Sequence, residues 1–558
     1  MSDPPATDER SVPAPVGGAG SLGPFAMGRW DIAPGWRERL QSGGAIDWFA
    51  LEGDPRATIV KANPNRRVWR VRLGDAALYV KAFRAAGWGD RLRSLFRGPE
   101  AVSEWRVGRS AAAAGVPSVG LVACGVRGSR MLGPESVLIT EAAEEAVSLP
   151  EAWREAVGED ARAGRGAASR GLTEAVARLV AGAHAARFLH RDGHPRNILV
   201  RRAGGTSPEV LYVDLYGAST GTVLSDERAA GGLAQLDQWF ARHASRSARL
   251  RFLKAYLAER FGDDGVSHEL VGSWTSAVDG ARRGQAAGLY AQRDRRLRRR
   301  GKYFAAMPLA GGWRATTALS FRNRDEFPQP IHPDRTAVEV RQWLEGMLSS
   351  IDQGGRWPAD VGVERFVPQG FAQRVAWTLT DGPAWGAFAA GHGLRHRNIP
   401  CVWPVAVLQR RSGFLMDECV LITERRPGAV SLVGLLDGSC SGADRWHDVE
   451  CRRAILESVG RLLADMNSAG VIWAAAEPPQ VWIEWIQPAG EPRALIGSAD
   501  GLSFVNPRTA EPVEEFVEAF IQGLQRRASA AAADLELVRE AFRRRLVWFG
   551  RRAPRQAG

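Results

Sequence analysis

The chain has 558 residues, 45% of them hydrophobic, which exceeds one ordinary domain and suits two domains that each bury a core. Five cysteines without a Cys-x-x-Cys pair argue against a disulfide framework and a thiolate zinc site, so a reducing cytoplasm is expected. The net charge of +12, carried almost entirely by arginine, favours an anionic partner, and we do not expect nucleic acid to be that partner.

The first stretch of the chain, residues 1–25, is rich in proline, glycine, serine and alanine, which predicts a disordered tail without a signal peptide. A second, basic tail is predicted at residues 549–558. No window of the sequence approaches the roughly 20 consecutive apolar residues that cross a bilayer. We therefore expect a cytoplasmic protein, with any membrane contact peripheral and at the inner face of the cytoplasmic membrane.

Between these tails the hydrophobic pattern predicts a small sheet first and helices later. Alternating apolar residues in RRVWRVRLGDAALYVKAF, residues 66–83, indicate two strands joined by a Gly-Asp turn. Residues 100–115 have the pattern of a helix that ends at a glycine, and strands are expected around Leu121 and Leu138. Helical sequence follows over residues 172–184 and recurs later. This order predicts an α+β fold with two lobes.

The sequence matches itself at a constant offset of 283 residues, which indicates an internal duplication. Residues 137–149 read VLITEAAEEAVSL and residues 420–432 read VLITERRPGAVSL, with nine of thirteen positions identical and no gap. A boundary is expected near the basic run RDRRLRRRGK, residues 293–302, because each unit then has a typical domain length. The predicted organisation is two tandem two-lobed domains, residues 26–300 and residues 301–548.

Four features of the first unit occur in the order and at the spacing of a phosphotransferase site. They are a strand-end lysine, a helical glutamate, an H-R-D-x-x-x-x-N segment and an aspartate after an apolar strand: Lys81, Glu104, Asp192 with Asn197, and Asp214. Each feature alone is ordinary, since a strand-end lysine is usually a solvated charge and an aspartate after a strand often caps a loop. Together they favour the kinase arrangement.

Phosphoryl transfer requires a carboxylate at the acceptor hydroxyl and oxygen ligands for Mg²⁺. Asp192 is the candidate catalytic base, because it begins the motif that ends at Asn197. Asn197 and Asp214 are the candidate metal ligands, since Mg²⁺ prefers hard oxygen atoms. These roles make the first unit the predicted catalytic domain.

The nucleotide phosphates also need a cation, which Lys81 would supply. Glu104 would hold that lysine by an ion pair, and Glu100, one helical turn earlier on the same face, is the substitute. No G-x-G-x-x-G loop precedes the lysine strand, where KANPNRRVW stands instead. Cover for the phosphates would then come from backbone amides with help from Arg66 or Arg67.

The segments FLHRDGHPRNILV, LYVDLYGAS and RRVWRV…YVKAF, followed by EW…AAGVP, resemble the lipopolysaccharide kinase (Kdo/WaaP) family over most of residues 58–260. The resemblance implies a protein-kinase-like fold, ATP with Mg²⁺ as the phosphate donor, and a sugar hydroxyl of the lipopolysaccharide inner core as the acceptor. It also makes VLITE the strand that connects the lobes, with Glu141 at its end as a candidate nucleotide contact. DLYG lacks the aromatic residue directly after Asp214, so an activation switch of the protein-kinase type is not expected.

In the second unit, the offset of 283 places residues without a charged side chain at four of the predicted site positions. For Asp192, Asn197, Asp214 and Glu104 these residues are, in turn, Ala475, Gln480, Gly497 and Ala387. A short gap would bring Asp500 opposite Asp214, Lys81 aligns with no residue unless a gap is opened, and no lysine follows Lys302. We expect a pseudokinase-like domain that acts as a scaffold or allosteric partner, while metal-free nucleotide binding through its hinge stays open.

The patterns leave three hypotheses for the whole chain. The leading one is an ATP- and Mg²⁺-dependent phosphotransferase that acts on a sugar hydroxyl of lipopolysaccharide core or a related glycolipid. A Ser/Thr protein kinase is the first alternative, although no defined activation loop is recognised, and a non-catalytic kinase-fold scaffold is the second. The basic run of residues 293–302 either contacts an anionic membrane or forms a solvated helix face.

Overall fold

The computed structural model describes most of the chain, and the statements below concern the described residues: 28–42, 46–63, 66–84, 98–128, 134–163, 166–201, 208–320, 335–352, 357–440, 443–473, 478–486, 490–507 and 514–548. The expectations for residues 1–25, residues 549–558 and Ala475 lie outside these ranges. The chain divides into two compact units, one of residues 1–232 and 251–271, the other of residues 233–250 and 272–558. The basic run at residues 293–302 thus belongs to the second unit.

The first unit contains a six-stranded antiparallel sheet in the order β1-β5-β6-β4-β3-β2. Its strands are β1 (Arg29–Ile32), β2 (Ala57–Asn63), β3 (Arg66–Leu73), β4 (Ala76–Phe83), β5 (Leu121–Arg127) and β6 (Glu135–Glu141). Buried residues alternate along β3, and Gly74 has a φ of 60° in the two-residue turn that leads into β4. The predicted hairpin is therefore present.

Two hydrophobic clusters cover opposite faces of this sheet. Leu78 and Val80 of β4 belong to a cluster that includes helix α1 (Trp36–Ser42). Phe83, three residues after Val80, packs with helix α3 (Glu100–Ala113) in the other cluster. Because successive strand residues face opposite sides, Lys81 lies on the α3 face with Phe83.

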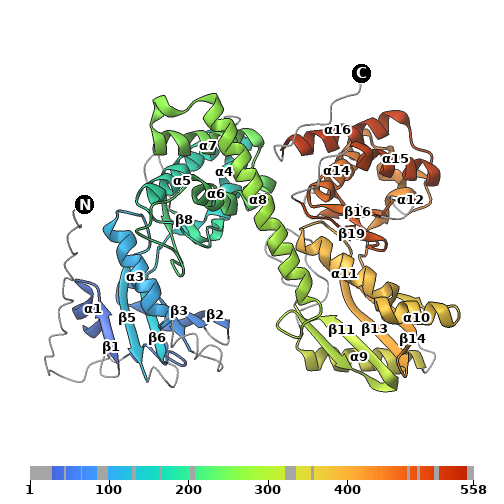
Figure 1. Cartoon of the computed structure of the whole chain (residues 1–558), viewed down its shortest axis with the longest axis horizontal. Helices are drawn as coiled ribbons and strands as arrows, with labels where there is room; N and C mark the ends of the chain where they lie inside the picture. The colour runs from blue at the N-terminus through green and yellow to red at the C-terminus, as the bar shows by residue number, and fades with distance from the viewer. Residues whose placement is uncertain are drawn as a thin grey trace, which may run out of the picture. The chain divides into compact units, whose positions relative to one another are not determined.

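The helical part of the first unit follows in sequence and lies at the other end of the unit from the large sheet (Figure 1). Its helices are α4 (Leu149–Ala163), α5 (Ala167–Ala185) and most of α7 (Arg246–Phe261), with the short 3-10 helices η1 (Pro195–Asn197) and η2 (Asp263–Gly265). Helix α6 (Asp226–His243) begins in the first unit, but most of its residues belong to the second. A three-stranded sheet accompanies them: β7 (Ala146–Ser148), β8 (Ile198–Arg201) and β9 (Glu209–Tyr212). The candidate catalytic loop precedes β8, and Asp214 follows β9.

The second unit contains a five-stranded sheet in the order β10-β11-β13-β14-β12. These strands are β10 (Phe304–Pro308), β11 (Trp313–Ala318), β12 (Val361–Phe366), β13 (Pro404–Ser412) and β14 (Leu415–Glu424). Smaller sheets are formed by β15 (Val430–Ser431), β17 (Val481–Ile486) and β18 (Glu491–Ile496), and by β16 (Val471–Trp473) with β19 (Leu502–Phe504). The mixture of sheets and helices in both units agrees with the α+β prediction, while the tandem two-lobed organisation stays a prediction.

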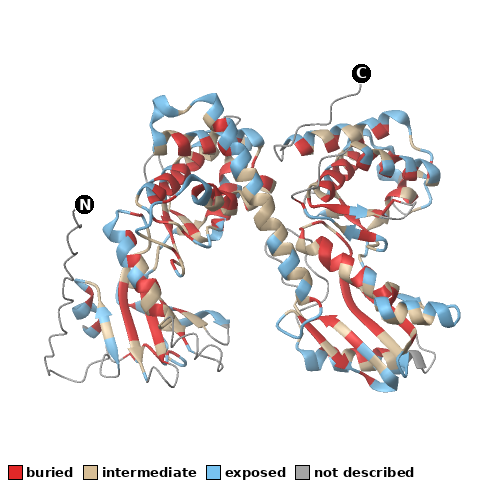
Figure 2. Ribbon diagram, in the orientation of Figure 1, coloured by how far each residue is buried: buried red, intermediate tan, exposed pale blue. Residues whose placement is uncertain are grey.

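Helices of the second unit pack around these sheets. They are α8 (His268–Arg296), η3 (Ala310–Gly312), α9 (Ala337–Asp352), α10 (Phe371–Thr380), α11 (Gly382–His396), α12 (Leu432–Leu436), α13 (Ala443–His447), α14 (Val449–Ser468), α15 (Glu514–Arg527) and α16 (Ala532–Trp548). Figure 2 shows the buried residues concentrated on β13, β14 and the inner sides of α11 and α14. Among the described helices, none combines the length and apolar character that a membrane span requires.

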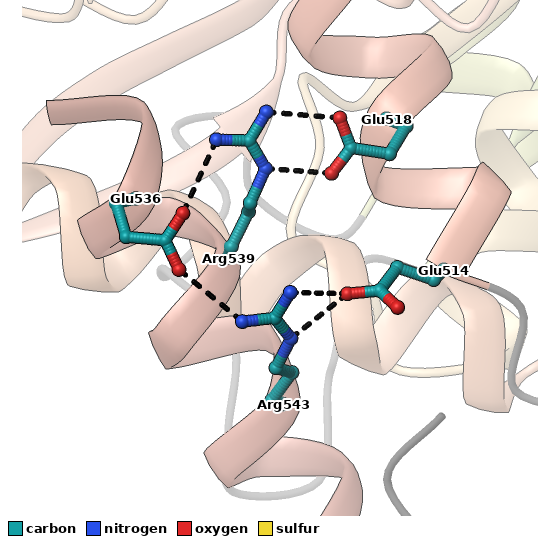
Figure 3. A network of polar contacts seen from close by, with 5 residues as sticks. All are labelled: Glu514, Glu518, Glu536, Arg539 and Arg543. Carbon is teal, nitrogen blue, oxygen red and sulfur yellow. Dashed lines mark hydrogen bonds and ion pairs between the residues drawn. The ribbon is translucent and has the colours of Figure 1, made fainter. Parts of the chain in front are cut away.

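An ion network joins α15 to α16 (Figure 3). Arg539 Nε and NH2 lie 2.6 and 2.9 Å from the two carboxylate oxygens of Glu518, which is a bidentate pair. Arg543 Nε donates to Glu514 at 2.9 Å, and Glu536 lies 3.3 and 3.2 Å from the two arginines. The network fixes the last two helices against each other.

Candidate active site

Strand β4 and helix α3 bring Lys81 and Glu104 together. Lys81 Nζ lies 2.6 Å from Glu104 Oε1, and the glutamate is 3% exposed. Burial raises the pKa of Glu104 above its ordinary value, and the ammonium of Lys81 offsets only part of that rise. The predicted lysine–glutamate pair is thus formed, and both of its side chains are largely shielded from solvent.

Asp214 reaches the same lysine from the loop after β9. Its Oδ1 lies 2.9 Å from Lys81 Nζ, and its Oδ2 lies 3.5 Å from Arg66 NH1. Although burial raises the pKa of Asp214, the positive charges of Lys81 and Arg66 outweigh it and hold the pKa below its ordinary value. The backbone of Asp214 has a φ of 56°, an unusual conformation for a non-glycine residue that is common at functional sites.

Asp192 and Asn197 lie together at the loop that contains η1. Asn197 Nδ2 donates to the Asp192 carbonyl oxygen at 2.8 Å and to its carboxylate Oδ2 at 3.2 Å. The amide nitrogen is thereby occupied, so the amide oxygen is the atom that Asn197 can offer to a metal ion. The Val213 N–H donates to the Asn197 carbonyl oxygen at 2.9 Å, which places this loop next to Asp214.

His190 connects the same loop to the segment before Asp214. Its Nε2 lies 3.1 Å from the carbonyl oxygen of Val213, and the residue is 5% exposed. Burial lowers the pKa of His190, which favours the neutral ring. Leu189 and Ser219 exchange two backbone hydrogen bonds of 2.9 and 3.0 Å beside it. The loop is therefore fixed by the backbone and by a buried histidine.

Two predicted nucleotide contacts lie apart from this group. Arg67, next to Arg66 on β3, forms its ion pair with Glu52, so the two arginines serve different partners. The carboxylate of Glu141, at the end of β6, lies against Gly120. A Cβ atom added to this glycine would be 2.5 Å from Glu141 Oε2. The structure thus gathers Lys81, Glu104, Asp214 and Arg66, with Asp192 and Asn197 adjacent.

The oxygen atoms of this site suit a magnesium ion. Asp214 supplies a carboxylate that is kept ionised by its neighbours, and Asn197 supplies an amide oxygen. Among the described residues, no three histidine, cysteine, aspartate or glutamate side chains gather as a metal cage. Mg²⁺ is usually held by one or two protein ligands with substrate phosphates and water, so the two ligands fit such an ion.

The second unit repeats the strand pairing of the first at the lysine position. Lys81 lies opposite Leu138 where β4 pairs with β6, and Glu364 lies opposite Leu421 where β12 pairs with β14. Leu138 and Leu421 occupy the same place in the repeated VLITE segment, so Glu364 corresponds to Lys81. This match needs no gap, and the expectation that the lysine position requires one is wrong.

The aspartate position of the second unit also differs from the alignment made on the sequence. In the first unit the N–H of the residue before Asp214 donates to Asn197 O at 2.9 Å, and in the second the Gly497 N–H donates to Gln480 O at 2.8 Å. Ser498 therefore corresponds to Asp214, one residue later than expected, because the segment from Gln480 to Gly497 is one residue longer than the segment from Asn197 to Val213.

Comparisons with known proteins agree with the arrangement of the first unit. The model of the lipopolysaccharide kinase (Kdo/WaaP) family matches residues 55–256 and residues 372–484. Lipopolysaccharide core heptose(I) kinase WaaP of Pseudomonas aeruginosa is 30% identical over 204 residues, which cover 34% of this chain and 73% of that protein.

Solved structures similar to parts of this chain include WaaP and one other kinase. WaaP in complex with acyl carrier protein is 23% identical, with a TM-score of 0.35, over 46% of this chain and 97% of the other. An ethanolamine kinase of Plasmodium vivax is 8% identical, with a TM-score of 0.27, over 42% of this chain and 75% of the other. The family model matches more than half of the chain, in segments from both of its halves. The chain therefore belongs to the lipopolysaccharide kinase (Kdo/WaaP) family and is a kinase, a phosphotransferase.

Proposed function

We propose that the first unit transfers the γ-phosphate of ATP, in the presence of Mg²⁺, to a sugar hydroxyl of lipopolysaccharide core or a related glycolipid. The observation that carries this proposal is the position of Lys81 between Glu104 and Asp214, at 2.6 and 2.9 Å. A cation held beside a metal-binding carboxylate is what the nucleotide phosphates require. Family membership supports the sugar acceptor.

In this proposal Asp214 and Asn197 hold Mg²⁺, which neutralises charge on the β and γ phosphates when it is bound. Lys81 contacts the α and β phosphates, and Glu104 keeps the ammonium in place. Arg66 lies 3.5 Å from Asp214 and replaces part of the cover that a glycine-rich loop gives elsewhere. The site thereby concentrates positive charge where the phosphates lie.

The chemical step uses Asp192. The acceptor oxygen forms a bond to the γ-phosphorus while the bond to the β–γ bridging oxygen breaks and ADP leaves. The hydroxyl proton passes to the Asp192 carboxylate, whose orientation is fixed by the hydrogen bond from Asn197 Nδ2 at 3.2 Å. Correct placement of the acceptor and the phosphate supplies most of the rate enhancement.

We further propose that the second unit is a degenerate copy of the first and carries no chemistry. The family model matches residues 372–484 of this unit, which supports common descent. Ala387 on α11 and Gln480 before β17 stand where the first unit has Glu104 and Asn197. Such a unit would serve as a scaffold or allosteric partner of the catalytic unit, near the inner face of the membrane where a glycolipid acceptor is reached.

The acceptor is tested by transfer of radiolabel from [γ-³²P]ATP in the presence of Mg²⁺. Lipopolysaccharide, total lipid and protein fractions from one incubation are separated and counted. Label in a lipopolysaccharide or glycolipid fraction, lost in the Asp192→Ala chain, supports the proposal. Label in the protein fraction alone would favour a Ser/Thr protein kinase, and absence of label from every fraction would favour a scaffold without turnover.

A further inference from the structure

We infer that the second unit excludes nucleotides, and that Glu364 and Trp482 are the residues that exclude them. The inference rests on the proposed function of the first unit, whose site is the reference for nucleotide binding. Exclusion of nucleotides goes beyond loss of catalysis, because a degenerate copy can still bind a nucleotide. It also means that the hinge of the second unit does not bind ATP.

Charge is the first reason for exclusion. Glu364 places a carboxylate where Lys81 places an ammonium, as the matched pairing of β12 with β14 requires. Partial burial, followed by the negative charge of nearby Asp500, raises the pKa of Glu364, so two acidic groups act on the same region. Nucleotide phosphates would meet repulsion at the position where the first unit attracts them.

The groups that surround the lysine in the first unit are replaced as well. Ala387, 4% exposed on α11, stands where Glu104 would hold a cation, and Ser498 stands where Asp214 would bind a metal ion. Removing the charge of Glu364 alone would thus not restore the two carboxylates that surround the lysine of the first unit. All three charged groups of the first site are replaced in the second unit.

Space is the second reason for exclusion. Ser148 lies opposite Leu199 where β7 pairs with β8, and Ser431 lies opposite Trp482 where β15 pairs with β17. Trp482 therefore occupies the position of Leu199, one residue before the buried Ile483 of the same strand. Because strand residues alternate, Leu199 and Trp482 both face away from the helical core, on the side of the candidate site.

Gly497 shows where the indole lies. A Cβ at Gly497 would lie 2.4 Å from Trp482 Nε1, so the ring rests directly against this glycine. Gly497 corresponds to Val213, the residue before Asp214, which carries a side chain in the first unit. The glycine makes room for an indole beside the former metal position, and the indole takes up space that the leucine of the first unit leaves open.

The test uses the full chain with its first site silenced by Lys81→Met and Asp214→Ala. Equilibrium dialysis with radiolabelled ATP, with and without Mg²⁺, gives the number of sites per chain. We expect one site in the wild-type chain and none in the silenced chain. Adding Glu364→Lys, Trp482→Leu and Gly497→Val to the silenced chain should increase ATP affinity at least tenfold, since it restores the cation and the first unit's packing.

Matched variants separate these effects from folding and net charge. Glu515→Lys, exposed on α15, changes the charge of the silenced chain equally and should leave ATP binding unchanged. Glu364→Lys alone alters an exposed residue, and circular dichroism of each chain reports folding. Stoichiometric ATP binding by the silenced chain, or a repaired chain no better than Glu515→Lys, would overturn the inference. Failure of the proposed function appears separately, as a wild-type chain that binds no ATP.

Discussion

Lys81 Nζ and Glu104 Oε1 lie 2.6 Å apart, with the glutamate side chain 4% and the lysine side chain 13% exposed. Removing one partner of such a pair leaves the other buried without compensation. We expect Lys81→Met to destabilise the first unit by about 3 kcal/mol, and Glu104→Met by less because Lys81 keeps Asp214. The two substitutions together should lower the free energy of unfolding by less than the sum of their single effects, with a difference of about 1 kcal/mol or more in urea unfolding. Strictly additive effects would argue against a coupled pair.

Arg66 and Arg67 give a matched comparison on one strand. Arg66 lies 3.5 Å from Asp214 Oδ2, whereas Arg67 pairs with Glu52. Arg66→Gln should raise the KM for ATP roughly tenfold, since a hydrogen bond to a charged group contributes about 1.5 kcal/mol. Arg67→Gln should change the KM less than twofold. Equal effects of the two substitutions in steady-state kinetics would contradict the assignment of Arg66 to the phosphates.

His184 makes the stability of the first unit depend on pH. Burial and then the nearby Arg260 lower the pKa of His184 to about 3, while its Nδ1 lies 2.8 Å from the Tyr256 hydroxyl. An unfolded histidine takes up a proton near pH 6.5, so between about pH 6.5 and 3 the unfolded state binds more protons and stability falls as the pH falls. The contribution is about 1.4 kcal/mol per pH unit in that range.

Substitution of His184 by Asn isolates this contribution, because the second unit has the buried Asn467 at the corresponding helix position. His184→Asn should cost stability at pH 7.5, where it loses the contact with Tyr256. The difference between the two chains should shrink by about 2 kcal/mol at pH 5, because the variant lacks the titrating group. Urea unfolding at both pH values measures it, and a difference that is constant with pH would contradict a buried neutral His184.

Strand β4, helix α3 and the four site features could be predicted from local patterns and their order. Which face of β3 lies toward Asp214 could not be predicted from the sequence, because that depends on how β4 and α3 pack against the strand. The residue of the second unit that corresponds to Lys81 was not identified from the sequence. VGVERF around Glu364 has no distinctive local pattern, but the constant offset of 283 residues places Glu364 opposite Lys81, and the pairing of β12 with β14 agrees with that correspondence. The positive φ of Asp214 likewise arises from tertiary contacts.

The basic run at residues 293–302 is partly engaged within the second unit. Arg298 NH1 lies 2.8 Å from Asp381, whereas Arg295, Arg299 and Arg300 are exposed. Each basic residue near an acidic surface contributes about 1 kcal/mol, so neutralising these three with glutamine should weaken binding to phosphatidylserine vesicles at least tenfold at low salt. Cosedimentation measures the change.

A control for this membrane prediction removes the same number of charges from exposed sites in the first unit. The residues replaced by glutamine in that chain are Arg37, Arg109 and Arg170. This chain should bind vesicles as the wild type does. Equal loss of vesicle binding in both chains would indicate a general effect of net charge. The basic run at residues 293–302 would then be a solvated segment at the end of α8.

The central claim, that Asp192 acts in the transfer step while Asp214 binds the metal–nucleotide complex, is tested by measuring transfer and binding on the same chains. Asp192→Ala should lower phosphate transfer at least a hundredfold, as general base catalysis contributes about 10² to 10⁴, and leave the ATP affinity within about threefold. Asp214→Ala should instead abolish the part of ATP affinity that depends on Mg²⁺. Near wild-type transfer by Asp192→Ala would contradict the account.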